Sequence, residues 1–94
     1  MIIQYNTKNI EDNVKNIIEH WNIYDKDYHI DFGEDCFNIV LTGKSEIFTD
    51  MIDELKECFN NDLILVRVEN GNIILVCEIV AGTPALYGEI PIFH

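Results

Sequence analysis

The dipeptide Asn70-Gly71 constrains the fold of this chain more than any other feature of its sequence. It lies between two runs rich in β-branched residues, Leu63 to Glu69 and Asn72 to Val80. Asn-Gly is the preferred pair for a two-residue type I′ turn between antiparallel strands, and such a turn fixes the strand register. The pairs predicted on one face are Val68 with Ile73, Val66 with Leu75, and Ile64 with Cys77.

Both faces of this predicted hairpin are largely apolar. The second face holds Leu63, Leu65, Arg67, Ile74, Val76, Glu78 and Val80. A sheet covered by helices on one side needs only one apolar face. We therefore expect the second face to be covered by the apolar C-terminal arm, residues 82–94, to mediate self-association, or to bind a partner, because a contiguous exposed apolar patch usually marks an interface.

The sequence upstream predicts five further elements. Apolar residues alternate with polar ones over residues 28–42, around a turn at 33–35, which is typical of a second hairpin. Apolar residues recur at helical spacing over residues 7–21 and again over residues 46–59, so both segments are expected to be amphipathic helices. Residues 2–5 are expected to form a short first strand.

The resulting β-α-β-β-α-β-β order predicts an α+β fold, a two-layer sandwich. We expect an antiparallel or mixed sheet of roughly four or five strands with two helices packed on one face. The first six elements match the ferredoxin-like order, which is an analogy of topology only. A chain of 94 residues is expected to be a single domain over residues 1–94, with an arm at 82–94.

The charge of the chain limits the partners it can have. Seventeen acidic residues against six basic ones give a net charge of −11. Strong binding to a phosphate backbone depends on Lys and Arg releasing counterions, so neither nucleic acid nor an anionic membrane is an expected ligand. The charge instead favours a basic protein as partner.

The sequence predicts a soluble cytoplasmic protein with reduced thiols. No apolar run approaches the roughly 20 residues that span a bilayer, and the N-terminal residues do not resemble a secretion signal. The three cysteines, Cys36, Cys58 and Cys77, lie in apolar segments, where a thiol packs as a small hydrophobic group.

No residue pattern indicates catalysis, a metal or a cofactor. The histidines His20, His29 and His94 are dispersed and lack the spacing of a zinc site. An EF-hand-like run begins at Asp25, but Ile30 and Cys36 occupy positions that need Gly and Glu. Because no Ser or Cys is placed beside a base, we expect a protein that is not an enzyme and holds no metal or cofactor.

Acidic residues cluster at two places. On the second predicted helix they fall on one face, where each neighbouring pair of like charges costs about 0.2–0.5 kcal/mol. A second group surrounds the first hairpin. The predicted partner-binding residues are Glu46, Asp50, Asp53, Glu54 and Glu57 on the helix, and Asp31, Glu34 and Asp35 on the hairpin.

In size, charge and lack of catalytic groups, the chain resembles the small acidic inhibitors of mobile elements such as phages. That group includes anti-CRISPR and anti-restriction proteins that mimic nucleic acid. The resemblance implies an inhibitor that occupies the basic nucleic-acid site of a nuclease or another nucleic-acid-binding enzyme. Two alternatives stay open: an immunity protein against a nuclease toxin, and a self-associating structural interaction domain, such as a homodimer, whose acidity serves only solubility.

Overall fold

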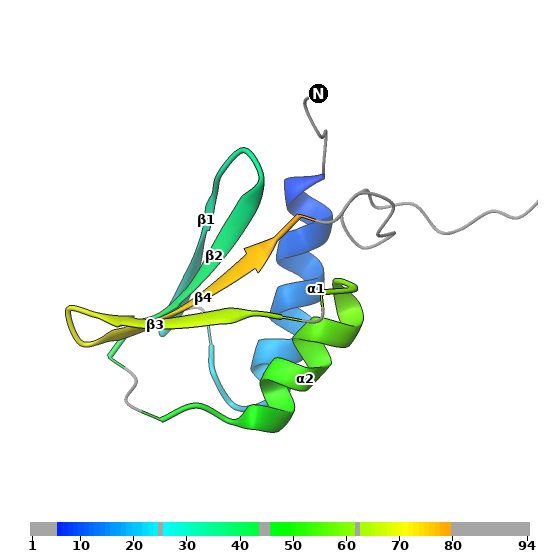
Figure 1. The fold of residues 1–94 in the computed structure, drawn as a ribbon. Coiled ribbons are helices and arrows are strands. Elements are labelled where there is room, and N and C mark those ends of the chain that lie inside the picture. Colours follow the sequence, from blue (N-terminus) through cyan, green and yellow to red (C-terminus); the bar gives the residue numbers. More distant parts are fainter. Residues whose placement is uncertain (1–5, 25, 44–45, 62, 80–94) are drawn as a thin grey trace, which may run out of the picture.

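The computed structural model of the chain describes residues 6–24, 26–43, 46–61 and 63–79. These residues form an α+β fold in which two helices pack against one face of a four-stranded sheet (Figure 1). The elements in chain order are α1 (Thr7–His20), β1 (Tyr28–Phe32), β2 (Cys36–Leu41), α2 (Thr49–Cys58), β3 (Leu65–Glu69) and β4 (Asn72–Glu78).

The sheet has the strand order β1-β2-β4-β3, and every neighbouring pair is antiparallel. The predicted α+β class with two helices is confirmed. The predicted β-α-β-β-α-β-β order is not matched, because the described elements begin with a helix. The first strand expected at 2–5 and the arm at 82–94 lie outside the described residues.

The ferredoxin-like arrangement does not fit this sheet. It needs the strand that precedes the first helix to lie inside the sheet. In this structure β2 has β1 on one side and β4 on the other, and β4 has β3 as its second neighbour. The interior positions are therefore filled by the two hairpins, which pair with each other through β2 and β4.

The Asn70-Gly71 hairpin has the predicted geometry. Asn70 and Gly71 have φ values of 52° and 76°, the positive values that a type I′ turn requires at both central residues. Val68 pairs with Ile73 and Val66 pairs with Leu75, as predicted. The ladder ends at Leu65, so the third predicted pair, Ile64 with Cys77, lies just beyond β3. The first hairpin is also confirmed, with Phe32 opposite Phe37 beside its turn.

The core lies between the helices and the two central strands. Its fully buried side chains come from both helices and from the two central strands, β2 and β4, whereas the edge strands β1 and β3 contribute none. They are Ile10, Val14 and Ile18 of α1, Met51 and Leu55 of α2, Phe59 at the end of α2, Phe37, Ile39 and Leu41 of β2, and Leu75 and Cys77 of β4. This one-sided core holds α2 rigidly against the sheet.

Asparagine residues lie at the start of α1 and just after the end of both helices. The Asn6 side chain accepts a hydrogen bond of 3.1 Å from the Asn9 N–H and so caps the start of α1. Asn22 and Asn60 follow the two helices with φ values of 63° and 50°, the left-handed conformation that commonly ends a helix. α2 starts without a side-chain cap, after Phe48.

Candidate partner-binding surface

The solvent-facing side of α2 carries three exposed carboxylates, those of Asp50, Asp53 and Glu57. They lie opposite Met51 and Leu55, which are fully buried on the core side of the helix. With about 100° of rotation per residue, the three acids fall within a narrow sector of the helix surface. We call Asp50, Asp53 and Glu57 the α2 acidic face.

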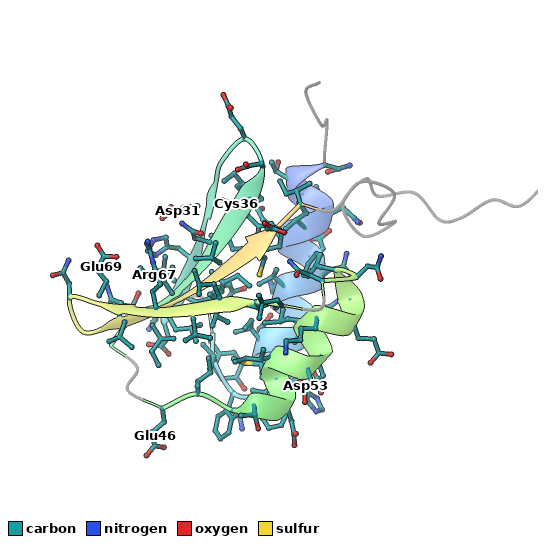
Figure 2. The ribbon with its side chains drawn as sticks, viewed as in Figure 1. Asp31, Cys36, Glu46, Asp53, Arg67 and Glu69 are labelled. Atoms are coloured by element: carbon teal, nitrogen blue, oxygen red, sulfur yellow. The ribbon has the colours of Figure 1, made fainter. Side chains whose placement is uncertain are left out.

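Glu46 does not belong to this face, so its predicted position on the helix is wrong. α2 begins at Thr49, and Glu46 lies in the non-helical segment before it. Figure 2 shows Glu46 well separated from Asp53. The physical reason is a tertiary contact: Phe48 stays outside the helix in an extended conformation and stacks on Trp21, with ring centroids 5.1 Å apart and an interplanar angle of 23°.

Glu54 lies on the helix but is engaged within the protein. Its Oε2 accepts a hydrogen bond of 3.3 Å from Nε1 of Trp21, and the contact is partly buried. The bond links the C-terminal end of α1 to α2. Glu54 is therefore a positioning residue for the two helices as well as a carboxylate at the border of the α2 acidic face. Sequence spacing contains no signal for this bond, because the two residues are 33 positions apart.

Basic side chains neutralise acids elsewhere but not on α2. Within residues 6–24, 26–43, 46–61 and 63–79, no ion pair involves Asp50, Asp53 or Glu57. The ion pairs found there are Lys8 with Asp12 at 3.2 Å, Lys15 with Glu19 at 3.9 Å, His29 with Asp31 at 3.5 Å, and Arg67 with Glu69 at 3.3 Å. The two helices thus differ: two acids of α1 are paired along its surface, whereas the α2 acidic face keeps its charge.

The predicted hairpin acids form a separate group. Asp31, Glu34 and Asp35 are all exposed, but Asp31 lies on the face of β1 that points away from the helices, opposite Asn38. Figure 2 shows Asp31 beside the sheet and Asp53 on α2. The eight predicted residues therefore do not make one surface. The structure brings together three of them on α2 and leaves the hairpin group on another part of the molecule.

The buried thiols are poor nucleophiles. Burial raises the pKa of the Cys77 thiol to about 12, with a further contribution from Cys36. Burial also raises the pKa of Cys58, whose Sγ lies 3.7 Å from Oδ1 of Asn13. Both thiols stay protonated at neutral pH, and the thiolate is the reactive form. Among the described residues, no three His, Cys, Asp or Glu side chains gather as ligands for a metal ion.

Comparison with known proteins identifies no family for this chain. No protein-family model, curated protein or solved structure matches this chain. No helix within the described ranges is long and apolar enough to cross a membrane. The choice of the α2 acidic face as the candidate binding surface therefore rests on its charge and geometry alone.

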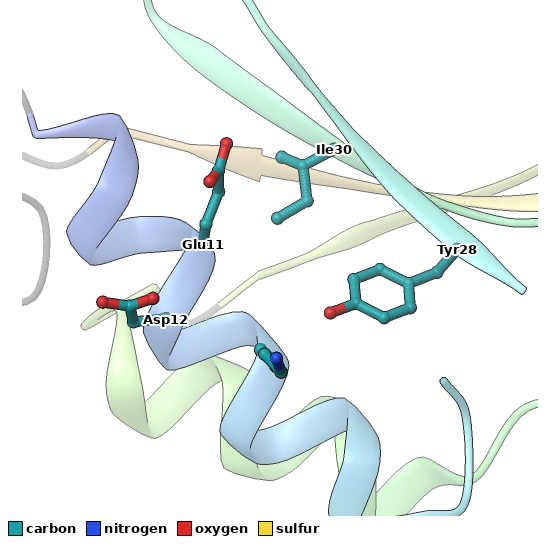
Figure 3. Close-up of a pocket in the computed structure, with 5 residues that line it drawn as sticks. Glu11, Asp12, Tyr28 and Ile30 are labelled. Carbon is teal, nitrogen blue, oxygen red and sulfur yellow. The ribbon is translucent and has the colours of Figure 1, made fainter. Parts of the chain in front are cut away.

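A groove of about 390 Å³ lies between α1 and β1 (Figure 3). Its lining residues are Glu11, Asp12, Lys15, Tyr28 and Ile30. A small-molecule site usually combines apolar walls with polar groups that converge on the ligand. Here Asp12 and Lys15 are bonded to neighbours along α1, and Figure 3 shows the Asp12 carboxylate directed away from Tyr28 and Ile30. The groove lacks that convergence, so it is a weaker candidate than the α2 acidic face.

Repulsion within the α2 acidic face has a measurable consequence for stability. Asp53 has like-charged neighbours at Asp50 and Glu57, three positions before it and four after it. Asp53→Asn removes these two repulsions and one favourable neighbour, Lys56 three positions later, so it is expected to raise the free energy of unfolding by about 0.2–0.5 kcal/mol at low salt. The gain should shrink as salt screens the charges. Urea unfolding at two ionic strengths checks this. Asp31→Asn is the control with the same chemical change outside α2, and an equal gain there would contradict local repulsion as the cause.

Proposed function

We propose that this protein is a stoichiometric inhibitor that places its α2 acidic face in the basic nucleic-acid site of a nucleic-acid-binding enzyme. One observation carries the proposal. Asp50, Asp53 and Glu57 are exposed together and take part in no ion pair among the residues that the structure describes, although two acids of the neighbouring α1 are paired. The neighbouring like charges on α2 destabilise the helix, which a cationic partner would relieve.

The spacing of these carboxylates supports mimicry of a phosphate backbone. Along an α-helix, residues four positions apart are separated by about 6 Å of rise, so Asp53 and Glu57 form a regular row of negative charge. Nucleic acid likewise presents closely and evenly spaced charges to its binding proteins. A basic channel built to accept phosphates would therefore meet a similar pattern on α2. The same field would speed association with that channel, most strongly at low salt.

Rigidity of the helix also favours this function. Met51, Leu55 and Phe59 anchor the other side of α2 in the core with no exposed surface, and Glu54 ties the helix to Trp21. The backbone that carries the acidic face is therefore ordered before binding. Binding by a preorganised surface avoids much of the entropy lost when a flexible segment becomes ordered.

Two matched triple variants test the proposal. The first reverses the α2 acidic face, D50K/D53K/E57K, and the second reverses the hairpin acids, D31K/E34K/D35K. Both change the net charge by the same amount. Each immobilised protein is used at two ionic strengths to capture proteins from a lysate of the source cell, and each purified partner is then tested for release of a bound oligonucleotide by the wild-type protein.

We expect the wild type and the hairpin variant to capture the same nucleic-acid-binding enzyme, with the α2 variant binding at least about a hundredfold more weakly, which corresponds to about 2.7 kcal/mol. The wild-type protein should release the oligonucleotide at one-to-one stoichiometry or a fixed ratio. Unchanged binding by the α2 variant would refute the proposal. Equal losses in both variants would show that overall acidity, and not the α2 acidic face, governs binding.

A further inference from the structure

β3 lies at an edge of the sheet formed by the described residues. Among these residues it has β4 as a neighbour on one side and no strand on the other. Leu65, Val66 and Val68 are 56%, 40% and 76% exposed, and Leu63 just before the strand is 75% exposed. Natural monomers usually protect an edge strand with Lys, Pro, a bulge or a covering element. β3 contains no Lys or Pro, and its side chains are exposed along its whole length.

The exposure of β3 occurs on both faces of the sheet. Val66 and Val68 lie on the helix side, since their partners Leu75 and Ile73 belong to the core. The helix layer does not cover these two valines, and Figure 1 shows the β3–β4 hairpin extending beyond α2. Leu65 lies on the opposite face. The sequence predicted an apolar second face, whereas the structure exposes apolar side chains on both sides of one edge.

The backbone of this edge has unpaired positions within the part of the chain that the structure describes. Residues that flank a two-residue hairpin loop form a hydrogen-bonded pair, and bonded and non-bonded pairs then alternate. Glu69 opposite Asn72 is the flanking pair, so Arg67 and Leu65 are also bonded to β4. The N–H and C=O groups of Val66 and Val68 must therefore point to the free edge. These groups are where another strand would bind.

Charge distribution indicates which strand fits. Between residues 63 and 77 the only charged side chains are Arg67 and Glu69, and they pair with each other at 3.3 Å. The protein has a net charge of −11, but the segment 63–77 has no net charge. Two copies can approach through it with one acidic residue each, Glu69, in the contact, and that residue is already paired with Arg67.

We propose that two copies of this chain associate by antiparallel pairing of β3 with β3 about a twofold axis at Val66, which joins two four-stranded sheets into one. The outward-pointing backbone groups then bond to each other. On the helix side, Val66 faces Val66 of the second copy and Ile64 faces Val68 of the second copy, so apolar residues meet. On the other face, Leu65 lies opposite Arg67 of the second copy. A shift that centred the axis on Arg67 would place two arginines directly opposite, which is unfavourable.

The other edge of the sheet does not offer the same surface. On β1 the outward face carries His29 and Asp31, which are charged or polar and exposed. Its helix side, with Tyr28, Ile30 and Phe32, is half-buried against the core. Both edge strands carry one charged pair on the outward face, so the difference between them is apolar exposure. Leu65, Val66 and Val68 of β3 are exposed, and β3 is therefore the edge at which apolar side chains of a second copy can meet.

Hydrogen exchange of the wild-type protein tests the backbone pairing without any substitution. The Val66 and Val68 amides should exchange rapidly at low protein concentration and become protected as the concentration rises, with sedimentation showing a monomer–dimer equilibrium. The Arg67 amide, which is bonded to β4, should be protected at every concentration. A protein that stays monomeric to about millimolar concentration, where even weak pairing would be visible, would overturn the proposal.

Two substitutions of the same leucine test the register. Leu65→Lys places a second cation opposite Arg67 of the other copy and should weaken dimerisation at least about tenfold, whereas Leu65→Glu places an anion there and should keep the constant within about threefold. Tyr24→Lys, at an exposed apolar position outside the edge, is the control for added charge. The reverse order of the two Leu65 variants would overturn the Val66-centred register, because it would place Leu65 opposite Glu69.

A proline tests the edge itself. Val68→Pro removes an N–H that points to the free edge and no bond to β4, so the variant should fold with the wild-type circular dichroism spectrum and remain monomeric. A folded Val68→Pro protein that still dimerises overturns the pairing. Salt separates this proposal from the function on α2: dimerisation of two acidic copies should strengthen with salt, whereas binding of the α2 acidic face to a basic partner should weaken.

Discussion

Replacing Phe37 by alanine is expected to lower the free energy of unfolding by about 3–5 kcal/mol. Phe37 of β2 is fully buried, and its ring packs edge-on against Phe59 with a centroid distance of 5.1 Å. It also lies 6.3 Å from the ring of Phe32. The truncation would remove contacts that join the sheet to the end of α2 and would leave a cavity that the rigid layers can fill only in part.

Urea unfolding measures this effect, with the change read from the midpoint at an unchanged slope. The loss would be a large part of the roughly 5–15 kcal/mol that stabilises a domain. Tyr24→Ala is the control, because it removes an aromatic ring of similar size from an exposed position and should change stability by less than about 1 kcal/mol. A Phe37→Ala loss as small as the control would contradict the packing described for the core.

Asn61→Ala is expected to lower the free energy of unfolding by about 1–3 kcal/mol, because two backbone groups in partly buried hydrogen bonds would lose their partner. Asn61 is only 5% exposed and is the one buried polar residue among those described. Its Nδ2 donates to the Glu78 carbonyl at 3.3 Å, and its Oδ1 accepts from the Leu63 N–H at 3.1 Å. A single amide thus connects the end of α2, the end of β4 and the approach to β3.

The matched control for this substitution is Asn16→Ala, an exposed asparagine on α1 that should change stability by no more than about 0.5 kcal/mol. Thermal or urea unfolding of both variants gives the comparison. Hydrogen exchange adds a local readout, since the Leu63 amide should lose protection in Asn61→Ala. A variant with wild-type stability would mean that water replaces both hydrogen bonds at little cost.

The two proposals concern different parts of the molecule, one acidic and one without net charge. The α2 acidic face carries carboxylates that form no ion pair with any other described residue, whereas β3 is an apolar edge whose two charges pair with each other. The two surfaces consist of different residues, so each can be changed by substitutions that leave the other unaltered. Each proposal fails independently in the experiments above, because one predicts weaker binding with salt and the other stronger association.

Local sequence was sufficient where a short-range rule governs structure. Asn70-Gly71 determined a turn and therefore the register of β3 with β4, because the backbone of a type I′ turn admits few other residues. Helical periodicity identified α1 and the buried side of α2, since the same apolar residues must face the core wherever the helix packs. The three carboxylates of the α2 acidic face follow from that same periodicity.

Long-range contacts decided the rest. Glu46 lies outside α2, contrary to the prediction, because Phe48 stacks on Trp21. Glu54 forms a hydrogen bond to that same tryptophan and so links the two helices. The order β1-β2-β4-β3 placed the hairpin acids away from α2 and left β3 at an edge. Sequence alone determined which local elements form and which residues of each are apolar, because turn geometry and helix periodicity are short-range. Only the tertiary structure decided which surfaces stay exposed, because exposure depends on which elements pack together.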